Sequence, residues 1–256
     1  MRRIFFVAMA LAFASSLHAG ITYRVETITE GARAHKMSSI AKVEGDRVRT
    51  EILEGDGKFF QNGDVMLGGK GSRVVTVLNP SKKTYYVIDF DALNKRTAET
   101  TENLKKYMTE SQPVVDVKDE GDGGFVEGYP THRYLVTTST EIKTTTNTSR
   151  IEMMGETWTT DKLPAEAMSL TEETFHSGDP MVDTTIKTMR SKISGFVLKA
   201  DHTSRLTMNG STTTSKMKLR VTNIHRADFP PSDFVVPPGY SKVENPIEEM
   251  LAKMGR

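Results

Sequence analysis

The stretch "KMKLRVTN", residues 216–223, decides the fold class because two kinds of side chain alternate along it. Met217, Leu219 and Val221 are apolar, whereas Lys or Arg occupies each position between and before them. Successive side chains of a β-strand point to opposite faces, so this alternation predicts a strand with one covered face and one face in water. Antiparallel sheets commonly have that arrangement, and the stretch therefore predicts an antiparallel sheet.

The same alternation recurs along the chain. It is present in "ITYRVE" at residues 21–26 and in "DRVRTEI" at residues 46–52. Turn signals rich in Gly, Asn or Pro separate such runs, as in "EGD" at residues 44–46 and "GDGG" at residues 121–124. Short strands joined by such turns predict a meandering antiparallel sheet, either a barrel or a strongly curved half-barrel.

Three segments instead predict helices, at residues 91–108, 179–193 and 245–255, because their apolar residues recur at helical spacing. The last begins with Asn245 as a helix cap. Helices inserted among antiparallel strands predict an α+β fold in which helices cover one face of the sheet. The chain has no repeat and no Gly-, Ser- or Pro-rich linker, so residues 20–256 are predicted to form a single domain.

The first residues predict export. Arg2 and Arg3 precede an apolar run that ends near Ala19, which is the layout of a secretory signal peptide covering residues 1–19. Cleavage after Ala14 fits the small-residue rule better but leaves a short apolar run, so cleavage after Ala19 is favoured. No later run is long and apolar enough to span a bilayer. An exported domain without cysteines favours the bacterial periplasm.

Charge argues against a nucleic-acid partner. The chain has 34 basic and 33 acidic residues, and loss of Arg2 and Arg3 with the signal peptide leaves it close to neutral. A near-neutral protein has no overall field that would attract nucleic acid or anionic lipid.

Two glycine-rich motifs superficially suggest ligand sites. "GDVMLGGKGS" at residues 63–72 lacks the Ser or Thr that follows Lys in a phosphate loop, so we interpret it as a mobile hairpin loop. "DVKDEGDGGFVE" at residues 116–127 has part of a calcium-loop pattern, but Lys118 stands where a cation ligand is needed. We interpret that motif as a surface turn.

The sequence predicts no enzyme, metal or cofactor. Zero cysteines exclude thiol catalysis and zinc–thiolate sites, and the histidines lack metal-ligand spacing. There is also no Gly-x-Ser-x-Gly nucleophile motif. A catalytic triad assembled only by the fold would not be visible in the sequence, which leaves a cryptic hydrolase as an alternative.

The apolar strand and helix faces are the remaining candidates for a functional surface. Methionine is frequent in them, and flexible thioethers suit irregular partners such as acyl chains, although methionine also fills ordinary cores. The predicted ligand-lining residues are Val75, Val77, Tyr85, Val87, Met153, Trp158, Ile186, Met189, Leu206, Met208, Met217, Leu219 and Val221.

The final segment, "DFPPSDFVVPPGYSKVE" at residues 228–244, contains four prolines and is called the strap below. Proline cannot donate a ladder hydrogen bond, so the strap is predicted to lie at a sheet edge and limit further pairing there. Its F-x-V-P-x-G-Y pattern at residues 234–240, together with a strand ending in Trp158 and the later "ISGFVLKA", resembles the LolA-like superfamily, most of all its uncharacterised relatives.

That resemblance covers residues 20–245 and implies an unclosed barrel whose concave apolar side holds an acyl chain or a hydrophobic peptide. It assigns no individual ligand contact. Our leading hypothesis is a periplasmic carrier whose partner is a hydrophobic ligand or a lipoprotein. The alternative is an envelope protein-interaction or stress-sensing module without an enclosed ligand, and the third hypothesis is the cryptic hydrolase.

Overall fold

A computed structural model describes residues 20–31, 34–55, 60–69, 72–105, 107–144, 146–164 and 180–248. The helical elements are α1 (Phe90–Lys105), α3 (Pro180–Lys192) and the short 3-10 helix η2 (Pro231–Phe234). The strands are β1 (Gly20–Gly31), β2 (His35–Glu44), β3 (Arg47–Glu54), β4 (Val65–Gly69), β5 (Val74–Asn79), β6 (Thr84–Asp89), β7 (Met108–Glu110), β8 (Val114–Val126), β9 (Tyr129–Thr144), β10 (Thr148–Thr160), β11 (Phe196–Met208), β12 (Ser211–Ala227) and β13 (Ser241–Lys242).

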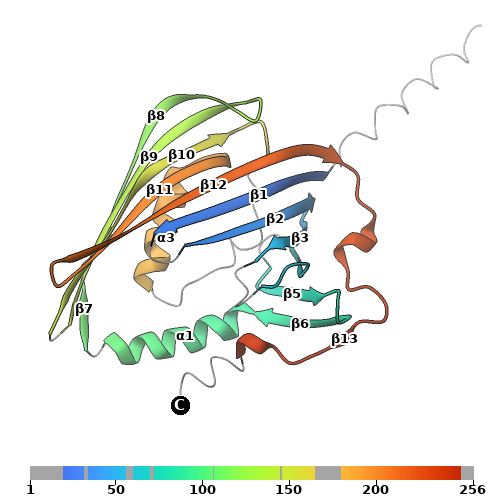
Figure 1. The fold of residues 1–256 in the computed structure, drawn as a ribbon, viewed down its shortest axis with the longest axis horizontal. Helices are drawn as coiled ribbons and strands as arrows, with labels where there is room; N and C mark the ends of the chain where they lie inside the picture. The colour runs from blue at the N-terminus through green and yellow to red at the C-terminus, as the bar shows by residue number, and fades with distance from the viewer. Residues whose placement is uncertain are drawn as a thin grey trace, which may run out of the picture.

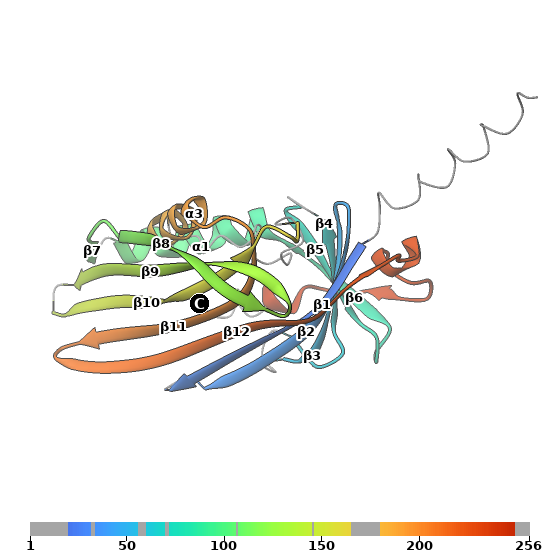
Figure 2. The same ribbon diagram turned by 90° about the horizontal axis from the view of Figure 1, so that it is seen from above.

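All of these strands belong to one strongly curved sheet that does not close (Figures 1 and 2). The strand order is β13-β6-β5-β4-β3-β2-β1-β12-β11-β10-β9-β7, with β8 also paired to β9. Every pairing is antiparallel except that of β13 with β6. The predicted α+β half-barrel, a strongly curved and unclosed sheet with added helices, is therefore confirmed.

The alternation seen in the sequence separates an inner, concave face from an outer, convex face. On the inner face Leu219 lies between Thr27 of β1 and Ala200 of β11. One residue along, Lys218 lies beside Asp201 on the outer face. The inner face of β1–β6, with the first residues of β11, carries most of the main buried cluster, whereas much of the outer face is occupied by ion pairs.

Helix α1 bridges the open side of the half-barrel. It follows β6 directly and leads to β7, which lies near the opposite edge of the sheet (Figure 1). The Asp89 carboxylate accepts hydrogen bonds from the backbone N–H groups of Asp91 and Ala92, which caps the start of the helix. Phe90 is buried in the main cluster, and Leu93 packs against that cluster. The bridge is thus anchored at its β6 end.

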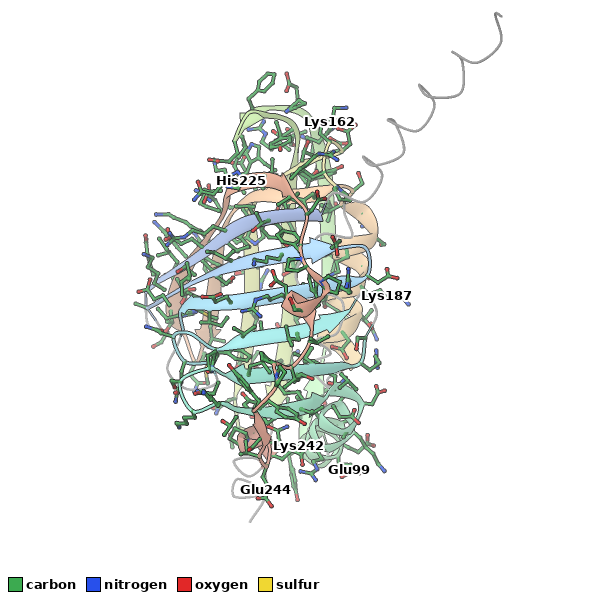
Figure 3. All side chains as sticks on the ribbon, turned by 90° about the vertical axis from the view of Figure 1, so that its right-hand side faces the viewer. Glu99, Lys162, Lys187, His225, Lys242 and Glu244 are labelled. Atoms are coloured by element: carbon green, nitrogen blue, oxygen red, sulfur yellow. The ribbon has the colours of Figure 1, made fainter. Side chains whose placement is uncertain are left out.

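The strap covers the outer face of β1–β6 and ends at the β6 edge. Figure 3 shows it running from near His225 at the end of β12 down to Lys242 and Glu244. Its Asp233 carboxylate accepts a hydrogen bond from Lys42 Nζ at 2.8 Å. Val236 and Tyr240 pack against the second apolar cluster, formed by Val65, Leu67 and Leu78.

Two backbone contacts complete the strap. Ser241 N–H donates to Lys83 O, and Val243 N–H donates to Tyr85 O, so the strap pairs with the outermost long strand at this end of the sheet. Beyond it, Asn245 Oδ1 accepts a hydrogen bond from Ile247 N–H, as predicted for a helix cap. Residues 246–248 are helical, and the rest of the predicted C-terminal helix lies outside the described residues.

Two sequence-based interpretations were wrong. Residues 116–127, expected to be a surface turn, lie mostly within β8, where two irregularities in the pairing with β9 accommodate the glycines. Residues 63–72, expected to be a mobile loop, contain β4, whose Val65, Met66 and Leu67 are all buried. In both stretches, burial or pairing across the sheet outweighs the local turn preference of glycine.

The two predicted internal helices are confirmed near the expected bounds, residues 91–108 and 179–193. Gly195 follows α3 at a positive φ of 91°, where a Cβ atom would meet Thr160 O at 2.8 Å. Glycine therefore allows the chain to turn from α3 into β11. The predicted signal peptide, residues 1–19, lies outside the described residues.

Candidate functional site

A pocket of about 230 Å³ opens on the inner face of the half-barrel. It lies over β1–β4 and is bordered by the start of β11 and the middle of β12. Its apolar lining residues are Tyr23, Val25, Met37, Ile52, Phe60, Met66, Phe196, Val197, Leu219 and Val221. Binding pockets commonly have a mostly apolar lining with few polar groups, which makes this pocket the candidate site.

Two aromatic rings form a rigid part of the lining. Tyr23 of β1 and Phe196 of β11 are 2% and 1% exposed, and their rings meet edge to face with centroids 5.2 Å apart. Such a pair is favourable beyond the area it buries. Beside it, Val25 pairs with Val221 across the β1–β12 ladder. The pocket is therefore built on the central strands of the sheet rather than on loops.

Four small hydroxyl side chains supply the polar part of the lining: Thr27, Ser38, Ser39 and Thr50. No lining residue in the described part of the chain carries a charge. Thr50 is 3% exposed, and its Oγ1 atom has no hydrogen-bond partner. The lining of the pocket is thus mainly apolar and uncharged, with a few hydroxyl groups from β1, β2 and β3.

Further from the pocket, the inner face remains apolar but is more exposed. Ile151, Leu206 and Met208 are 42%, 38% and 44% exposed. Ile151 pairs directly with Leu206, and the half-buried Met153 follows on the same face two residues along β10. These residues lie near the start of β10 and the end of β11, towards the turns of the β9–β10 and β11–β12 hairpins.

His202 is a titratable group on this inner face. It lies between Gly155 of β10 and Met217 of β12, and its Nε2 atom is 3.0 Å from Thr157 Oγ1. A Cβ atom on Gly155 would lie 2.4 Å from His202 Cδ2, so glycine makes room for the imidazole. Burial lowers the pKa of His202, against the opposing effect of the Asp201 carboxylate.

This lowered pKa predicts acid sensitivity. The unfolded chain, with an ordinary histidine pKa of about 6.5, binds the proton more tightly than the folded protein does. Stability should therefore fall as the pH drops below about 6.5, and His202→Gln should reduce that fall. The loss of stability is measured as the difference between the urea unfolding midpoints at pH 7.5 and pH 5.5. His225→Gln, at an exposed position, is the control. If His202→Gln and wild type show the same difference between the two urea midpoints, His202 is not the source of the acid sensitivity.

The structure places the predicted lining residues in five groups. Leu219 and Val221 line the pocket, while Val75 and Val77 face inward but are buried in the main cluster. Met153, Leu206, Met208 and Met217 lie on the inner face beyond the pocket. Ile186 and Met189 are half-buried on α3, which packs against β8. Tyr85, Val87 and Trp158 lie on the outer face.

The three outer residues have other packing roles. Tyr85 packs against the second apolar cluster beneath the strap, and Val87 O accepts a hydrogen bond from Asn245 Nδ2. The Trp158 ring lies under Lys199, whose Nζ is 3.8 Å from the ring centroid. An alternating pattern does not say which of its two faces is concave, and Trp158 sits among charged neighbours on the opposite face.

Most of the residues that line the pocket were not among the candidates. Tyr23 and Val25 belong to the alternating stretch "ITYRVE", so their shared face could be read from the sequence. The place of Phe60 and Phe196 in the pocket could not be read from the sequence, because only the curvature of the sheet brings them close to β1. Among the described residues, no group of three or more His, Asp or Glu side chains could hold a metal ion.

None of the described helices combines the length and apolar character needed to cross a membrane. The unclosed sheet, the bridging helix and the apolar inner pocket together define an open half-barrel fold. Residues 24–240 match the family described as "Domain of unknown function (DUF4412)", and the chain belongs to this family. No curated protein sequence matches the chain.

Solved structures with a related arrangement share little sequence with it. PNGF-II is 13% identical with a TM-score of 0.36, over 93% of this chain, which spans only 34% of PNGF-II. An uncharacterized conserved protein from Thermus thermophilus is 10% identical with a TM-score of 0.37, covering 89% of this chain and 91% of that one. A LolA superfamily protein from Nitrosomonas europaea is 10% identical with a TM-score of 0.28, covering 85% and 90%.

Proposed function

We propose that this protein is an exported carrier that shelters the acyl chain of a hydrophobic ligand in the inner pocket of the half-barrel. The observation that supports it most directly is the pocket itself, which is open, uncharged and lined mainly by apolar side chains. Transfer of apolar ligand surface out of water supplies the driving force, at roughly 25 cal/mol per Å² before ordering costs.

The size of the pocket limits what it can hold. Its volume of about 230 Å³ lies below the roughly 300–1,000 Å³ of pockets for drug-sized ligands. It therefore suits one slender chain rather than a bulky ring system. The apolar inner face beyond the pocket, around Ile151 and Leu206, offers further surface to a longer ligand.

Filling the pocket provides the test. Thr27 lines the pocket from β1, so Thr27→Trp should place an indole where the chain would lie. We expect the affinity for a twelve-carbon probe, methyl laurate, to fall at least about tenfold, which corresponds to about 1.4 kcal/mol. Native mass spectrometry would measure uptake, and an NMR titration would measure the dissociation constant.

Thr203→Trp is the matched control, because Thr203 lies on the outer face opposite Met154 of β10. It adds the same bulk to the sheet without entering the pocket and should leave binding unchanged. If Thr27→Trp fails to fold, Val25→Phe fills the same pocket with a smaller change. Equal uptake by wild type and both folded pocket variants, or no uptake by wild type, would overturn the proposed function.

The cellular setting is part of the same proposal. A signal peptide at residues 1–19 would deliver the carrier to the periplasm, where the ligand would come from a lipid or a lipoprotein. Mass spectrometry of protein purified from periplasm, with and without organic extraction, would detect such a ligand. Protein retained in the cytoplasm with residues 1–19 still attached would contradict the setting.

A further inference from the structure

We propose that the pocket recognises an acyl chain together with its uncharged carbonyl, which belongs to an ester or an amide, and that the Thr50 hydroxyl donates a hydrogen bond to this carbonyl. This inference rests on the proposed function and makes its ligand class specific. It predicts that a free carboxylate on the same chain is rejected.

The first observation is the unsatisfied hydroxyl of Thr50. Thr50 lines the pocket from β3, between Ala41 of β2 and Met66 of β4, and is 3% exposed. Its Oγ1 atom has no hydrogen-bond partner in the protein. A buried polar group without a partner costs stability, so its presence needs an explanation.

A ligand supplies that explanation. A hydroxyl donates one hydrogen bond and can accept two, and a carbonyl oxygen is a natural acceptor for its proton. The hydroxyl and the methyl group of threonine occupy alternative staggered positions, so a rotation about χ1 can present the hydroxyl to the pocket. The hydrogen bond from Thr50 to the ligand carbonyl would remove the free-energy cost of leaving this hydroxyl unsatisfied.

The second observation is the absence of charge among the described lining residues. The polar lining consists of hydroxyl side chains only, at Thr27, Ser38, Ser39 and Thr50. A carboxylate moved into such a site would lose its hydration without gaining a cationic partner, which is strongly unfavourable. An ester or amide carbonyl carries no net charge, and one or two hydroxyl groups can satisfy it.

The experiment measures the affinities of wild type and one variant for four probes that have the same chain length but different head groups. Wild type and Thr50→Val are titrated by NMR with methyl laurate, N-methyl lauramide, laurate at pH 8 and 1-chlorododecane. Valine keeps the shape of threonine but has no hydroxyl group. We expect wild type to bind the ester or the amide at least tenfold more tightly than laurate.

In Thr50→Val, the affinity for the ester and the amide should fall roughly three- to tenfold, the range set by one net hydrogen bond. Affinity for 1-chlorododecane should be kept or increased, and the urea midpoint should be kept or raised, because an unsatisfied hydroxyl has been removed. Comparing ester with amide distinguishes a glycerolipid-like from an N-acyl source. Thr137→Val makes the same change at an exposed position on the outer face of β9, opposite Met154, and is the control.

The outcomes separate the two proposals. If no twelve-carbon probe binds wild type, the proposed function itself fails. If 1-chlorododecane binds but laurate binds as well as the ester, or if Thr50→Val weakens all probes equally, the pocket is a general apolar site and the carbonyl assignment is overturned.

Discussion

Phe196→Ala should lower the free energy of unfolding by about 3–5 kcal/mol, the range for removing a large buried aromatic side chain. Phe196 is 1% exposed, belongs to the main buried cluster and packs edge to face on Tyr23. The substitution removes both the buried apolar area and the ring contact. Because β11 and β1 lie on either side of β12, the loss should weaken packing across three neighbouring strands.

Urea unfolding followed by the fluorescence of Trp158, the one tryptophan in the chain, would measure this change. Phe196→Leu keeps most of the buried volume and should lose clearly less stability than Phe196→Ala. Phe196 also lines the pocket, so the alanine variant should enlarge it and admit a branched twelve-carbon chain that wild type excludes. A change in the unfolding free energy below about 1 kcal/mol would show that this ring pair does not anchor the core.

Trp158→Ala should destabilise the protein by a comparable amount, about 3–5 kcal/mol, but leave ligand affinity unchanged. Trp158 is 9% exposed on the outer face, where Lys199 lies over its ring. The bulged part of β8 also covers it, because a Cβ atom on Gly123 would lie 2.8 Å from Trp158 Cδ1. The indole therefore joins β8 to β10 and β11 on the side of the sheet away from the pocket.

Circular dichroism must follow this variant, since it has no tryptophan fluorescence. Affinity for methyl laurate should be measured well below the unfolding temperature, so that only folded protein is compared. A tenfold loss of affinity in folded Trp158→Ala would place the indole in the binding site, contrary to its position here. Together, Phe196→Ala and Trp158→Ala separate a loss of stability from a change in the pocket.

Much of the architecture could be predicted from local patterns. The alternation in "KMKLRVTN" and "ITYRVE" predicted β12 and β1, and both form long antiparallel strands. Pro180 and Gly195 bracket α3 as their backbone preferences require. The glycine-rich "EGD" does form the predicted turn between β2 and β3, but the turn predicted from "GDGG" was wrong, since that stretch lies within β8. There the glycines allow close approach to Trp158 and left-handed backbone at Gly121 and Gly124, which no local pattern indicates.

The pocket was harder to predict than the sheet. Leu219 and Val221 were expected near a ligand and do line the pocket, whereas Tyr85 and Val87 lie on the outer face of β6. Both pairs belong to strands with apolar faces, and the local sequence does not indicate which pair faces the pocket. The strap covers the outer side of β4–β6 with Val236 and Tyr240, so apolar residues are buried there on both faces of the sheet.

By itself, the sequence determined which residues share a strand face, where two helices begin and end, and that the strap would close an edge. These properties depend on backbone preferences and on neighbours a few positions away. Only the tertiary structure decided which face is concave, which residues from distant strands meet at the pocket, and that Thr50 lacks a partner there. Sheet curvature arises from twist and bulges summed over many strands, so the site exists only after β1–β4 and β11–β12 have come together.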